Sequence, residues 1–458
     1  MLSNAIFLGN KFHITSLGCA RNLVDSEVMI GLLLKAGYEI TPEHQEADFL
    51  IINTCGFLEA SRAEALTILQ ELFNEKKEGA KVIVTGCMVQ KHKDLLQEKF
   101  PSIHYLLGSG DVEKILEAIQ SLSQGSQITD AKSYLQWGEV PRTLSTPKHY
   151  AYLKIAEGCR KRCSFCIIPM IKGHLKSKTI EQVLKEFELL LSQGVFEVIL
   201  IAQDLGDYGK DRNEKQGLHQ LIRKLLEVKK DFWLRFLYLY PDEIDEEFIA
   251  IMKSDPRICP YLDMPIQHIN DVILKKMRRT TNRQEILSTL SLLRTELPQV
   301  VIRTSLMVGF PGESEEQFQE LKQFVQEYEL DNIGVFKYSK EEGSYSATLD
   351  GHISEEIKER RYAELMQEQK KVVEKKNKRL VGKIVEAIVE GYHPESPLLI
   401  RARYYGQCPD IDGQILINDP KYIDAFSKRY FVEITGFAGY DLIGRVLSSK
   451  RRSKLALA

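Results

Sequence analysis

Short apolar runs alternate with amphipathic stretches along most of this 458-residue chain, and this alternation limits the possible folds more than any other feature. After Tyr150, six runs have the composition of buried strands: AYLKIAEG, FEVILIAQ, FWLRFLYLY, YLDMPIQH, VIRTSLMVGF and NIGVFKYS. Strands that alternate with helices form parallel sheets. Six repeats are too many for a small flavodoxin-like sheet and too few for a closed eight-fold barrel. The sequence therefore predicts an open, partial (βα)6 barrel.

The N-terminal part of the chain repeats this alternation on a smaller scale. Its apolar runs are FHITSL (12–17), ADFLIINT (47–54) and KVIVTG (81–86). Amphipathic stretches at 22–37 and from about Ser61 predict the helices between these strands. The pattern favours an α/β domain with a doubly wound parallel sheet, which we expect over residues 1–140.

The C-terminal part has a different pattern. A long charged segment from about Ser354 to Leu380 predicts a helix, and short apolar runs separated by turn residues follow it. Such spacing favours a small antiparallel β-barrel of the oligonucleotide-binding (OB) type. We therefore expect the partial barrel over 148–375, the small barrel over 378–447 and a basic tail at 448–458.

Composition excludes several classes of protein. The 62 Lys and Arg residues balance 64 Asp and Glu, so the overall charge does not favour wrapping by nucleic acid. Eight cysteines are too few for a disulfide framework in a chain of this length, and they indicate metal chemistry in a reducing compartment. The N-terminus lacks the features of a secretory signal, and no apolar run approaches the about 20 residues that span a bilayer. We expect a soluble, cytoplasmic protein without membrane contact.

Three cysteines lie within eight residues at Cys159, Cys163 and Cys166. Three thiolates can hold three irons of a cubane cluster and leave the fourth iron open to a small molecule, whereas electron-transfer clusters use four cysteines. Zinc is the alternative, with His174 as a fourth ligand, but structural zinc sites usually pair C-x-x-C halves that are far apart. The triplet favours an iron–sulfur site that binds and activates a ligand.

A second set consists of Cys19, Cys55 and Cys87, each of which follows a predicted strand. Residues just beyond parallel strands gather along one edge of a doubly wound sheet, so these cysteines can form one metal site. The alternative for each is plain packing as a small hydrophobic residue. Cys259 and Cys408 have no partners at suggestive spacing, and we expect them to be structural.

The motifs resemble those of a known family. CRKRCSFC is similar to the cluster motif of radical S-adenosylmethionine (SAM) enzymes, and SLGCARNLVDSE, INTCGF and TGCM add a resemblance to methylthiotransferases. YLDMPIQH and GFPGES also match family segments. The resemblance covers nearly the whole chain and implies a methylthiotransferase domain, a radical SAM partial barrel and a C-terminal TRAM barrel.

The resemblance implies two four-iron, four-sulfur clusters. Cys159, Cys163 and Cys166 would hold the cluster that binds SAM, and the second cysteine set would hold an auxiliary cluster that carries the transferred sulfur. In the family, an electron from the first cluster cleaves SAM to a 5′-deoxyadenosyl radical, which removes hydrogen from an unactivated carbon. The resemblance implies that SAM is both the source of the radical and the donor of the methyl group. The required low cluster potential implies an external donor such as flavodoxin or ferredoxin.

Further expectations concern contacts with SAM. They fall on Phe165, Gln203, Arg303, Gly309 and Gly312. Each has a plain alternative, such as a salt bridge, a helix cap, core packing or a turn. Lys172 and Lys178 stand where the family more often has arginine, so a bidentate contact is in doubt there. We expect His268 to be structural.

Two branches of the family differ in substrate. The RimO-type branch modifies the β-carbon of an aspartate in ribosomal protein uS12, and the other modifies an isopentenyladenosine-type nucleoside in tRNA. SLGCARNLVDSE, LIAQDLGDYG and CPDIDG resemble the first branch. Between Arg379 and Arg445, eight Lys and Arg residues face nine Asp and Glu residues, whereas a tRNA-binding barrel should be basic. We therefore expect uS12 as the partner, free or in the small subunit, rather than direct tRNA binding.

Three alternatives stay open. The basic residues Lys450, Arg451, Arg452 and Lys454 suit RNA contact as well as a solvated tail. The chain also fits a non-enzymatic RNA-binding protein with structural clusters. A sulfur-inserting or methylating radical enzyme outside this family is the last alternative.

Overall fold

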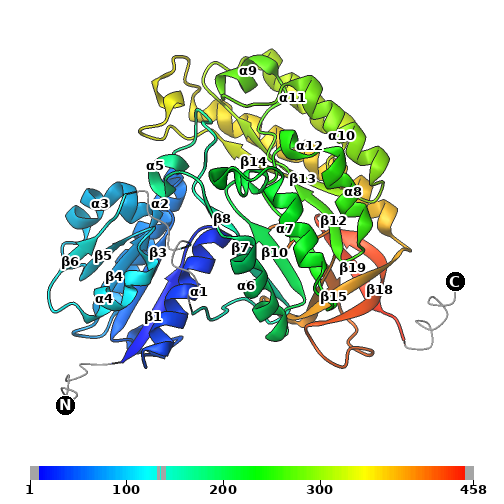
Figure 1. Ribbon diagram of the computed structural model, residues 1–458. Helices are drawn as coiled ribbons and strands as arrows, with labels where there is room; N and C mark the ends of the chain where they lie inside the picture. Colours follow the sequence, from blue (N-terminus) through cyan, green and yellow to red (C-terminus); the bar gives the residue numbers. More distant parts are fainter. Residues whose placement is uncertain (1–9, 131–134, 136–140, 449–458) are drawn as a thin grey trace.

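The computed structural model describes residues 10–130, 135 and 141–448. The expected basic tail, apart from Ser448, lies outside these residues. Within them the chain forms two parallel sheets and one closed barrel, which confirms the predicted fold class (Figure 1). None of the described helices is long and apolar enough to cross a membrane.

The N-terminal sheet is parallel, with strand order β2-β1-β3-β4-β5-β6. Its strands are β1 (Lys11–Ser16), β2 (Glu39–Ile40), β3 (Phe49–Thr54), β4 (Lys81–Gly86), β5 (Tyr105–Gly108) and β6 (Gly125–Gln127). Its helices are α1 (Ala20–Lys35), α2 (Glu59–Glu75), α3 (Cys87–Lys99) and α4 (Ile115–Gln120). Helices α1 and α4 pack on one face, and α2 and α3 on the other. The central strand β3 is therefore buried throughout, which explains its uninterrupted apolar sequence.

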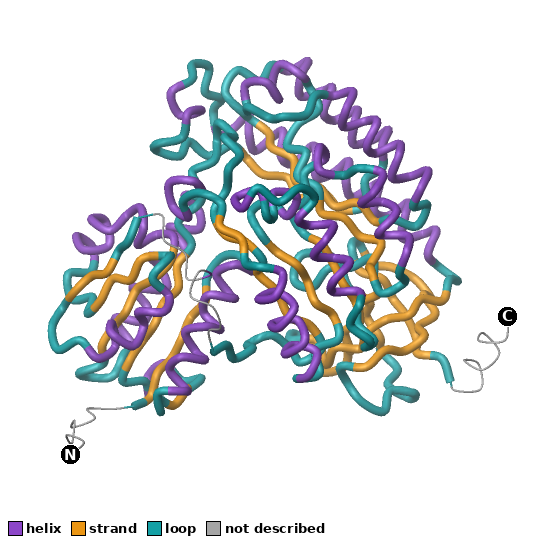
Figure 2. The backbone as a smooth tube through the Cα atoms, in the orientation of Figure 1, coloured by secondary structure: helices purple, strands orange, loops and turns teal. Residues whose placement is uncertain are grey.

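The second sheet is the predicted partial barrel, with strand order β14-β13-β12-β11-β10-β7 and parallel pairing throughout. Its strands are β7 (Tyr150–Lys154), β10 (Glu197–Ile201), β11 (Trp233–Phe236), β12 (Ile258–Asp263), β13 (Val301–Val308) and β14 (Asn332–Lys337). Its helices are α6 (Ile180–Ser192), α7 (Gly217–Leu226), α8 (Glu246–Ser254), α9 (Asp271–Lys276), α10 (Arg283–Glu296) and α11 (Glu315–Tyr328). The outer helices cover the sheet and form one large apolar core with it (Figure 2).

Local sequence fixes where several of these helices begin. Thr179, Asn282 and Ser314 start α6, α10 and α11 with reciprocal capping boxes, in which the cap side chain and a Gln or Glu three residues later bond each other's backbone N–H. Each helix thereby starts at a defined distance from the preceding strand. A single polar residue thus fixes where each of these three helices begins.

Between β7 and α6 lies the loop with the cysteine triplet. It contains β8 (Ala156–Glu157), the short helix α5 (Ile168–Lys172) and β9 (Lys176–Ser177), and β8 and β9 pair antiparallel. Figure 1 shows α5 between the N-terminal sheet and the barrel. The loop therefore lies where these two parts meet.

A long helix, α12 (Glu355–Leu380), leads to a closed C-terminal barrel. The barrel strands are β15 (Ile384–His393), β16 (Ser396–Tyr404), β17 (Ile415–Ile417), β18 (Lys428–Ala438) and β19 (Asp441–Val446). One detail differs from the prediction, because β17 and β19 pair parallel while the other pairs are antiparallel. The hairpin formed by β18 and β19 brings β19 beside β17 in the same direction as β17.

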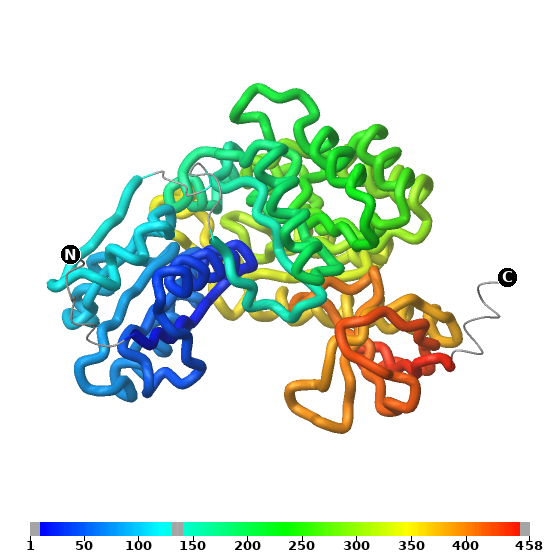
Figure 3. The backbone as a smooth tube through the Cα atoms, turned by 60° about the horizontal axis from the view of Figure 1, so that its bottom comes forward, coloured from blue at the N-terminus to red at the C-terminus, as the bar shows by residue number. Residues whose placement is uncertain are grey.

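Buried ion pairs hold this C-terminal barrel against the N-terminal ends of the parallel strands. Arg235 Nε lies 2.6 Å from Glu197 Oε1, and Arg403 Nη2 lies 2.9 Å from Glu197 Oε2. Arg403 also pairs with Glu390, whose carboxylate lies 2.9 Å from His149 Nε2. The C-terminal barrel and the N-terminal domain lie on different sides of the molecule (Figure 3).

Candidate active site

The triplet loop follows β7 at the carboxyl end of the barrel strands, where ligands bind in such folds. Backbone bonds shape it, with Cys159 N–H donating to Gly173 O (3.2 Å) and Cys166 N–H to Cys163 O (3.1 Å). Cys159 is buried, while Cys163 and Cys166 are half-buried. The three thiols therefore share one compact loop with partial access from outside.

The surroundings of the triplet are suited to sulfur anions. Arg279 Nη1 donates to Cys163 Sγ at 3.5 Å, and the Tyr240 hydroxyl lies 3.7 Å from the same sulfur. Burial and the neighbouring thiols raise the pKa of Cys159 to about 11 and that of Cys166 to about 12. Thiols held so close together in a dry site exchange their protons for a metal when it binds.

The second cysteine set also comes together. Gly18 (φ +94°) turns the loop before Cys19 so tightly that a Cβ on it would lie 2.8 Å from Cys55 Cβ. Asn22 links the three strand ends, because its Nδ2 donates to Leu17 O and Thr54 O, each at 3.1 Å. The Cys87 thiol lies 3.8 Å from Asn22 Oδ1. The structure thus brings the three strand ends together at one sheet edge, and metal binding by their cysteines stays a prediction.

Electrostatics support this arrangement. Burial, Cys19 and Cys55 together raise the pKa of Cys87 to about 12, against the lowering effect of Lys172. Burial also raises the pKa of Cys19, but Arg21 and the backbone N–H groups outweigh it, so this thiol has a pKa below its usual range. Cys19 therefore ionises more readily than Cys87.

The two cysteine sets face each other across the junction of domains. Cys87 packs against Ile167, which directly follows Cys166 in the chain, and against Ile171 in α5. Burial raises the pKa of Cys166, while Arg21 of the N-terminal domain lowers it, so Arg21 acts on both sets. The junction between the N-terminal sheet and the barrel is therefore the candidate site.

The donor geometry distinguishes the candidate metals. Among the described residues, only Asp204, Asp207 and Glu243 bring three ligand atoms within 4.8 Å of one another. Zinc binds sulfur at about 2.3 Å, so thiolates that share one zinc lie closer together than about 4.6 Å. Neither cysteine set meets that limit. A cubane cluster suits the wider spacing, because each thiolate bonds a different iron. His174 is exposed, which gives zinc no support.

Two expected SAM contacts lie at the site. Gln203 directly follows Ala202 at the carboxyl end of β10, and its buried Oε1 has no hydrogen-bond partner. An orphaned buried acceptor is suited to a ligand with N–H or O–H groups. Phe165, in the triplet loop, packs near Phe310 and Tyr338. SAM binding by Gln203 and Phe165 stays a prediction, and plain packing also accounts for Phe165.

The other expected contacts have internal explanations. Gly309 and Gly312 have φ values of +76° and +73°, and a Cβ would meet Lys358 at the first and Lys276 at the second. Arg303 lies five residues before the end of β13, roughly 16 Å from the carboxyl edge. Its guanidinium contacts Asp263 Oδ1 at 2.9 Å. SAM binding by these residues stays a prediction.

The other cationic and cysteine positions are enclosed by protein. Lys178 pairs with Glu186, and His268 is fully buried with Asn270 N–H donating to its Nδ1 (3.0 Å). Cys259 and Cys408 are buried in an apolar cluster inside the barrel. These placements agree with the structural roles expected for His268 and the two cysteines.

A group of carboxylates borders the triplet. Burial raises the pKa of Asp204 to about 7, and among its neighbours Lys161 lowers it while Asp207 and Glu243 raise it. Lys161 Nζ lies 3.4 Å from Asp204 Oδ2, and Lys210 Nζ lies 2.8 Å from Glu243 Oε1. The two lysines offset most of this negative charge.

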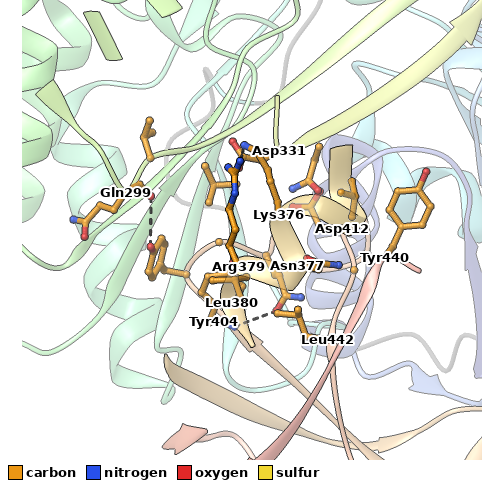
Figure 4. Close-up of a pocket in the computed structure, with 18 of the residues that line it drawn as sticks. Gln299, Asp331, Lys376, Asn377, Arg379, Leu380, Tyr404, Asp412, Tyr440 and Leu442 are labelled. Carbon is orange, nitrogen blue, oxygen red and sulfur yellow. Dashed lines mark hydrogen bonds and ion pairs between the residues drawn. The ribbon is translucent and has the colours of Figure 1, made fainter. Parts of the chain in front are cut away.

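A pocket of about 310 Å³ lies far from the two cysteine sets. Figure 4 shows it between α12 and the C-terminal barrel, with Asp331, Lys376, Tyr404 and Asp412 around it. It opens at the N-terminal ends of β13 and β14, opposite the candidate site. The pocket therefore lies where the partial barrel, α12 and the C-terminal barrel meet.

Sequence reasoning missed several residues of the site: Arg21, Asn22, Tyr238, Tyr240 and Arg279. Arg21 and Asn22 lie within three residues of Cys19, which is the signal that could have found them. Tyr238 and Tyr240 follow β11, and only the folded partial barrel brings them to the cysteines.

Comparisons with known proteins agree with this geometry. Three family models match in succession: the uncharacterized protein family UPF0004 at residues 11–108, the radical SAM superfamily at 153–325 and the TRAM domain at 381–447. The radical SAM methyltransferase TsrM from Kitasatospora setae, solved with cobalamin and a [4Fe-4S] cluster, has a similar fold (TM-score 0.53, 16% identity, 72% of this chain and 75% of that chain).

Relatives named "Ribosomal protein uS12 methylthiotransferase RimO" match almost the whole chain. That of Protochlamydia amoebophila is 64% identical over 96% of this chain and 93% of the relative. That of Bdellovibrio bacteriovorus is 43% identical over 95% of this chain and 97% of the relative. The chain therefore belongs to the RimO family of radical SAM methylthiotransferases.

Proposed function

We propose that this enzyme transfers a methylthio group to the β-carbon of an aspartate in ribosomal protein uS12, with SAM as radical source and methyl donor. The observation that carries the proposal is the meeting of two cysteine sets across one domain junction, where Cys87 packs against the residue that follows Cys166. A carbon atom bound there lies within reach of both sets. Hydrogen removal and sulfur delivery need that arrangement.

In this proposal Cys159, Cys163 and Cys166 hold the SAM-binding [4Fe–4S] cluster, and Cys19, Cys55 and Cys87 hold the auxiliary one. When bound, the first cluster supplies the electron that cleaves SAM, and the second carries the sulfur. Gln203 and Phe165 contact SAM from the barrel, and the loop with Gly309 and Gly312 closes over it. Arg303 stays an expected SAM contact, although its guanidinium already pairs with Asp263 (2.9 Å).

The proposed division of labour follows the domains. Residues 1–140 form the auxiliary-cluster domain, 148–375 the radical SAM domain and 378–447 the TRAM domain. The aspartate-bearing protein, rather than tRNA, is the substrate in this proposal, because three arginines of the TRAM domain already pair with carboxylates. Arg403 pairs with Glu197, Arg429 with Asp231 and Arg445 with Glu433. Phosphate binding needs free cations.

The electron donor in this proposal is a small acidic protein of low potential, such as a flavodoxin or ferredoxin. Arg160, Arg162 and Arg278 are exposed and border a pocket of about 380 Å³ that reaches Cys163. Opposite charges steer such partners together. Since ribosomal proteins are made in the cytoplasm, we place the reaction there.

The test is a set of single Cys→Ala variants of the full chain, reconstituted with iron and sulfide. Assays with SAM, dithionite and uS12 would measure 5′-deoxyadenosine and the methylthio product separately. Variants at 159, 163 or 166 should lose SAM cleavage altogether. Variants at 19, 55 or 87 should still cleave SAM but form no methylthio product.

The Cys259→Ala variant is the matched control, because Cys259 is buried away from both sets, and it should retain both activities. Loss of SAM cleavage in a folded Cys55→Ala variant with an intact first cluster would refute the proposed division. Methylthiolation of tRNA but not of uS12 by the unmodified enzyme would refute the proposed substrate.

A further inference from the structure

An aspartate side chain brings a negative charge into the candidate site. Its carboxylate is bonded directly to the β-carbon, so both enter the space between the cysteine sets together. A carboxylate that leaves water needs a cation or several N–H donors to replace its hydration. A substrate-binding cation should therefore lie at the domain junction.

Arg21 occupies this position. Arg21 lies two residues after Cys19, in the first turn of α1. Its Nη1 donates a hydrogen bond to Ala202 O (2.9 Å) at the carboxyl end of β10. Its guanidinium also stacks over the Tyr238 ring, 4.9 Å from the ring centre. An N-terminal-domain residue thus reaches the mouth of the barrel between the two cysteine sets.

The backbone of Tyr238, the residue whose ring lies under the Arg21 guanidinium, is strained. Its φ is +63°, in the left-handed region that a bulky side chain rarely adopts. Such strain persists where surrounding contacts impose it, and it is concentrated at ligand sites. Asp263 accepts a hydrogen bond from Tyr238 N–H (3.3 Å), which fixes the backbone that presents the ring to Arg21.

Other cations near the junction already have partners. Lys161 pairs with Glu243 and Lys172 with Glu157, and Arg279 donates to Cys163 Sγ and to Pro265 O. By contrast, Arg21 contacts Ala202 O and the Tyr238 ring, and no carboxylate among the described residues pairs with it. Its side chain is half-buried, and a guanidinium has five N–H donors, so donors remain for a ligand.

We propose that Arg21 binds the carboxylate of the substrate aspartate and thereby selects an acidic side chain for modification. A guanidinium can hold a carboxylate with two parallel hydrogen bonds, which fixes the orientation of the adjacent β-carbon. The contact with Ala202 and the Tyr238 ring keeps the guanidinium at the mouth of the barrel. This inference rests on the proposed function, since it presumes an aspartate substrate.

The test compares a uS12 peptide that carries the target aspartate with the same peptide carrying asparagine. Binding to the full chain with both clusters reconstituted would be measured by fluorescence anisotropy with SAM but without reductant, so that no turnover occurs. The unmodified enzyme should bind the aspartate peptide about 10- to 100-fold more tightly than the asparagine peptide. Arg21→Met should abolish this preference, and Arg21→Lys should retain part of it because the charge remains.

Arg62→Met is the matched control. Arg62 also crosses the domain boundary, with its Nη1 2.6 Å from Glu341 Oε2, but it does not contact a cysteine. This variant should keep the aspartate preference, which separates substrate binding from loosening of the junction. Iron content of about eight per chain would verify that both clusters are present in each variant. If Arg21→Met cannot hold both clusters, Arg21→Lys decides the question.

An unchanged aspartate preference in Arg21→Met, or in Arg21→Lys where that variant decides, would overturn the inference. So would equal binding of both peptides by the unmodified enzyme. Failure of the proposed function has a different signature, because the unmodified enzyme with dithionite would then leave the aspartate of uS12 without a methylthio group.

Discussion

At the scale of single residues, the junction depends on buried charges that compensate one another. Lys172 Nζ lies 2.9 Å from Glu157 and 3.2 Å from Asp25, and Lys154 pairs with both carboxylates. All four side chains are buried. Burial lowers the pKa of Lys172, but Glu157 and Asp25 outweigh it and raise that pKa well above the usual range. The lysine is therefore charged, and it connects α1 to the triplet loop.

Substitution of Lys172 should show how strongly the stability of the protein depends on this charge compensation. Lys172→Met leaves buried negative charge uncompensated and should lower the free energy of unfolding by about 3 to 5 kcal/mol. The double variant Asp25→Asn with Lys172→Met removes one charge of each sign and should cost less than the two single variants together. Urea unfolding of the full chain would measure this, and strictly additive effects would contradict the account.

At the scale of elements, the loop at 408–413 closes the floor of the partial barrel. The Tyr261 hydroxyl donates to Asp412 Oδ2 (2.7 Å), and Cys408 N–H donates to the same atom (2.9 Å). Tyr150 donates to Asp410 in the same loop (2.9 Å). The segment CPDIDG, which resembles the TRAM signature of one family branch, thus has a structural role at the end opposite the cysteines.

Asp412→Ala should therefore destabilise the protein without affecting cluster assembly. It leaves the Tyr261 hydroxyl without its acceptor and removes the carboxylate beside Arg303, at a cost of about 2 to 3 kcal/mol. Asp419→Ala in an exposed turn of the same barrel is the control, with an expected change within about 0.5 kcal/mol. Thermal unfolding and iron analysis would measure both quantities. Loss of iron in folded Asp412→Ala would show that the floor and the cluster site are not independent.

At the scale of the whole molecule, the barrel is held between two domains, each attached through buried ion pairs. The N-terminal domain meets its carboxyl edge, and the TRAM barrel meets its floor. Burial raises the pKa of Glu390, but Arg403 and His149 outweigh it and lower that pKa to about 2. A carboxyl with a depressed pKa contributes stability above its unfolded pKa, and the contribution is lost as pH falls towards the folded pKa.

Acid should therefore weaken the attachment of the TRAM barrel between about pH 4.5 and pH 2, with a loss of about 3 kcal/mol from Glu390. Glu390→Gln should be less stable at neutral pH and should show a shallower decline over the same range. Urea unfolding of the cluster-free chain at several pH values would measure both slopes. Parallel slopes for the two proteins would contradict the role of Glu390.

Sequence patterns predicted the architecture because buried parallel strands are continuous apolar runs. The run at 81–86, for example, coincides with β4. They also predicted that Cys19, Cys55 and Cys87 gather, because strand ends share one sheet edge. The contacts of Arg21 and Tyr238 escaped prediction, since they depend on how two domains dock and on an unusual backbone angle. The parallel pairing of β17 with β19 was missed for a similar reason, because closure of a barrel leaves no local signature.

The most direct test of the central claim is mass spectrometry of ribosomal proteins and tRNA nucleosides from cells with and without this gene. The account predicts a methylthio group on the aspartate-bearing peptide of uS12 only when the gene is present, with tRNA unchanged. A change confined to the modified adenosine of tRNA, with uS12 unmodified in both strains, would contradict it.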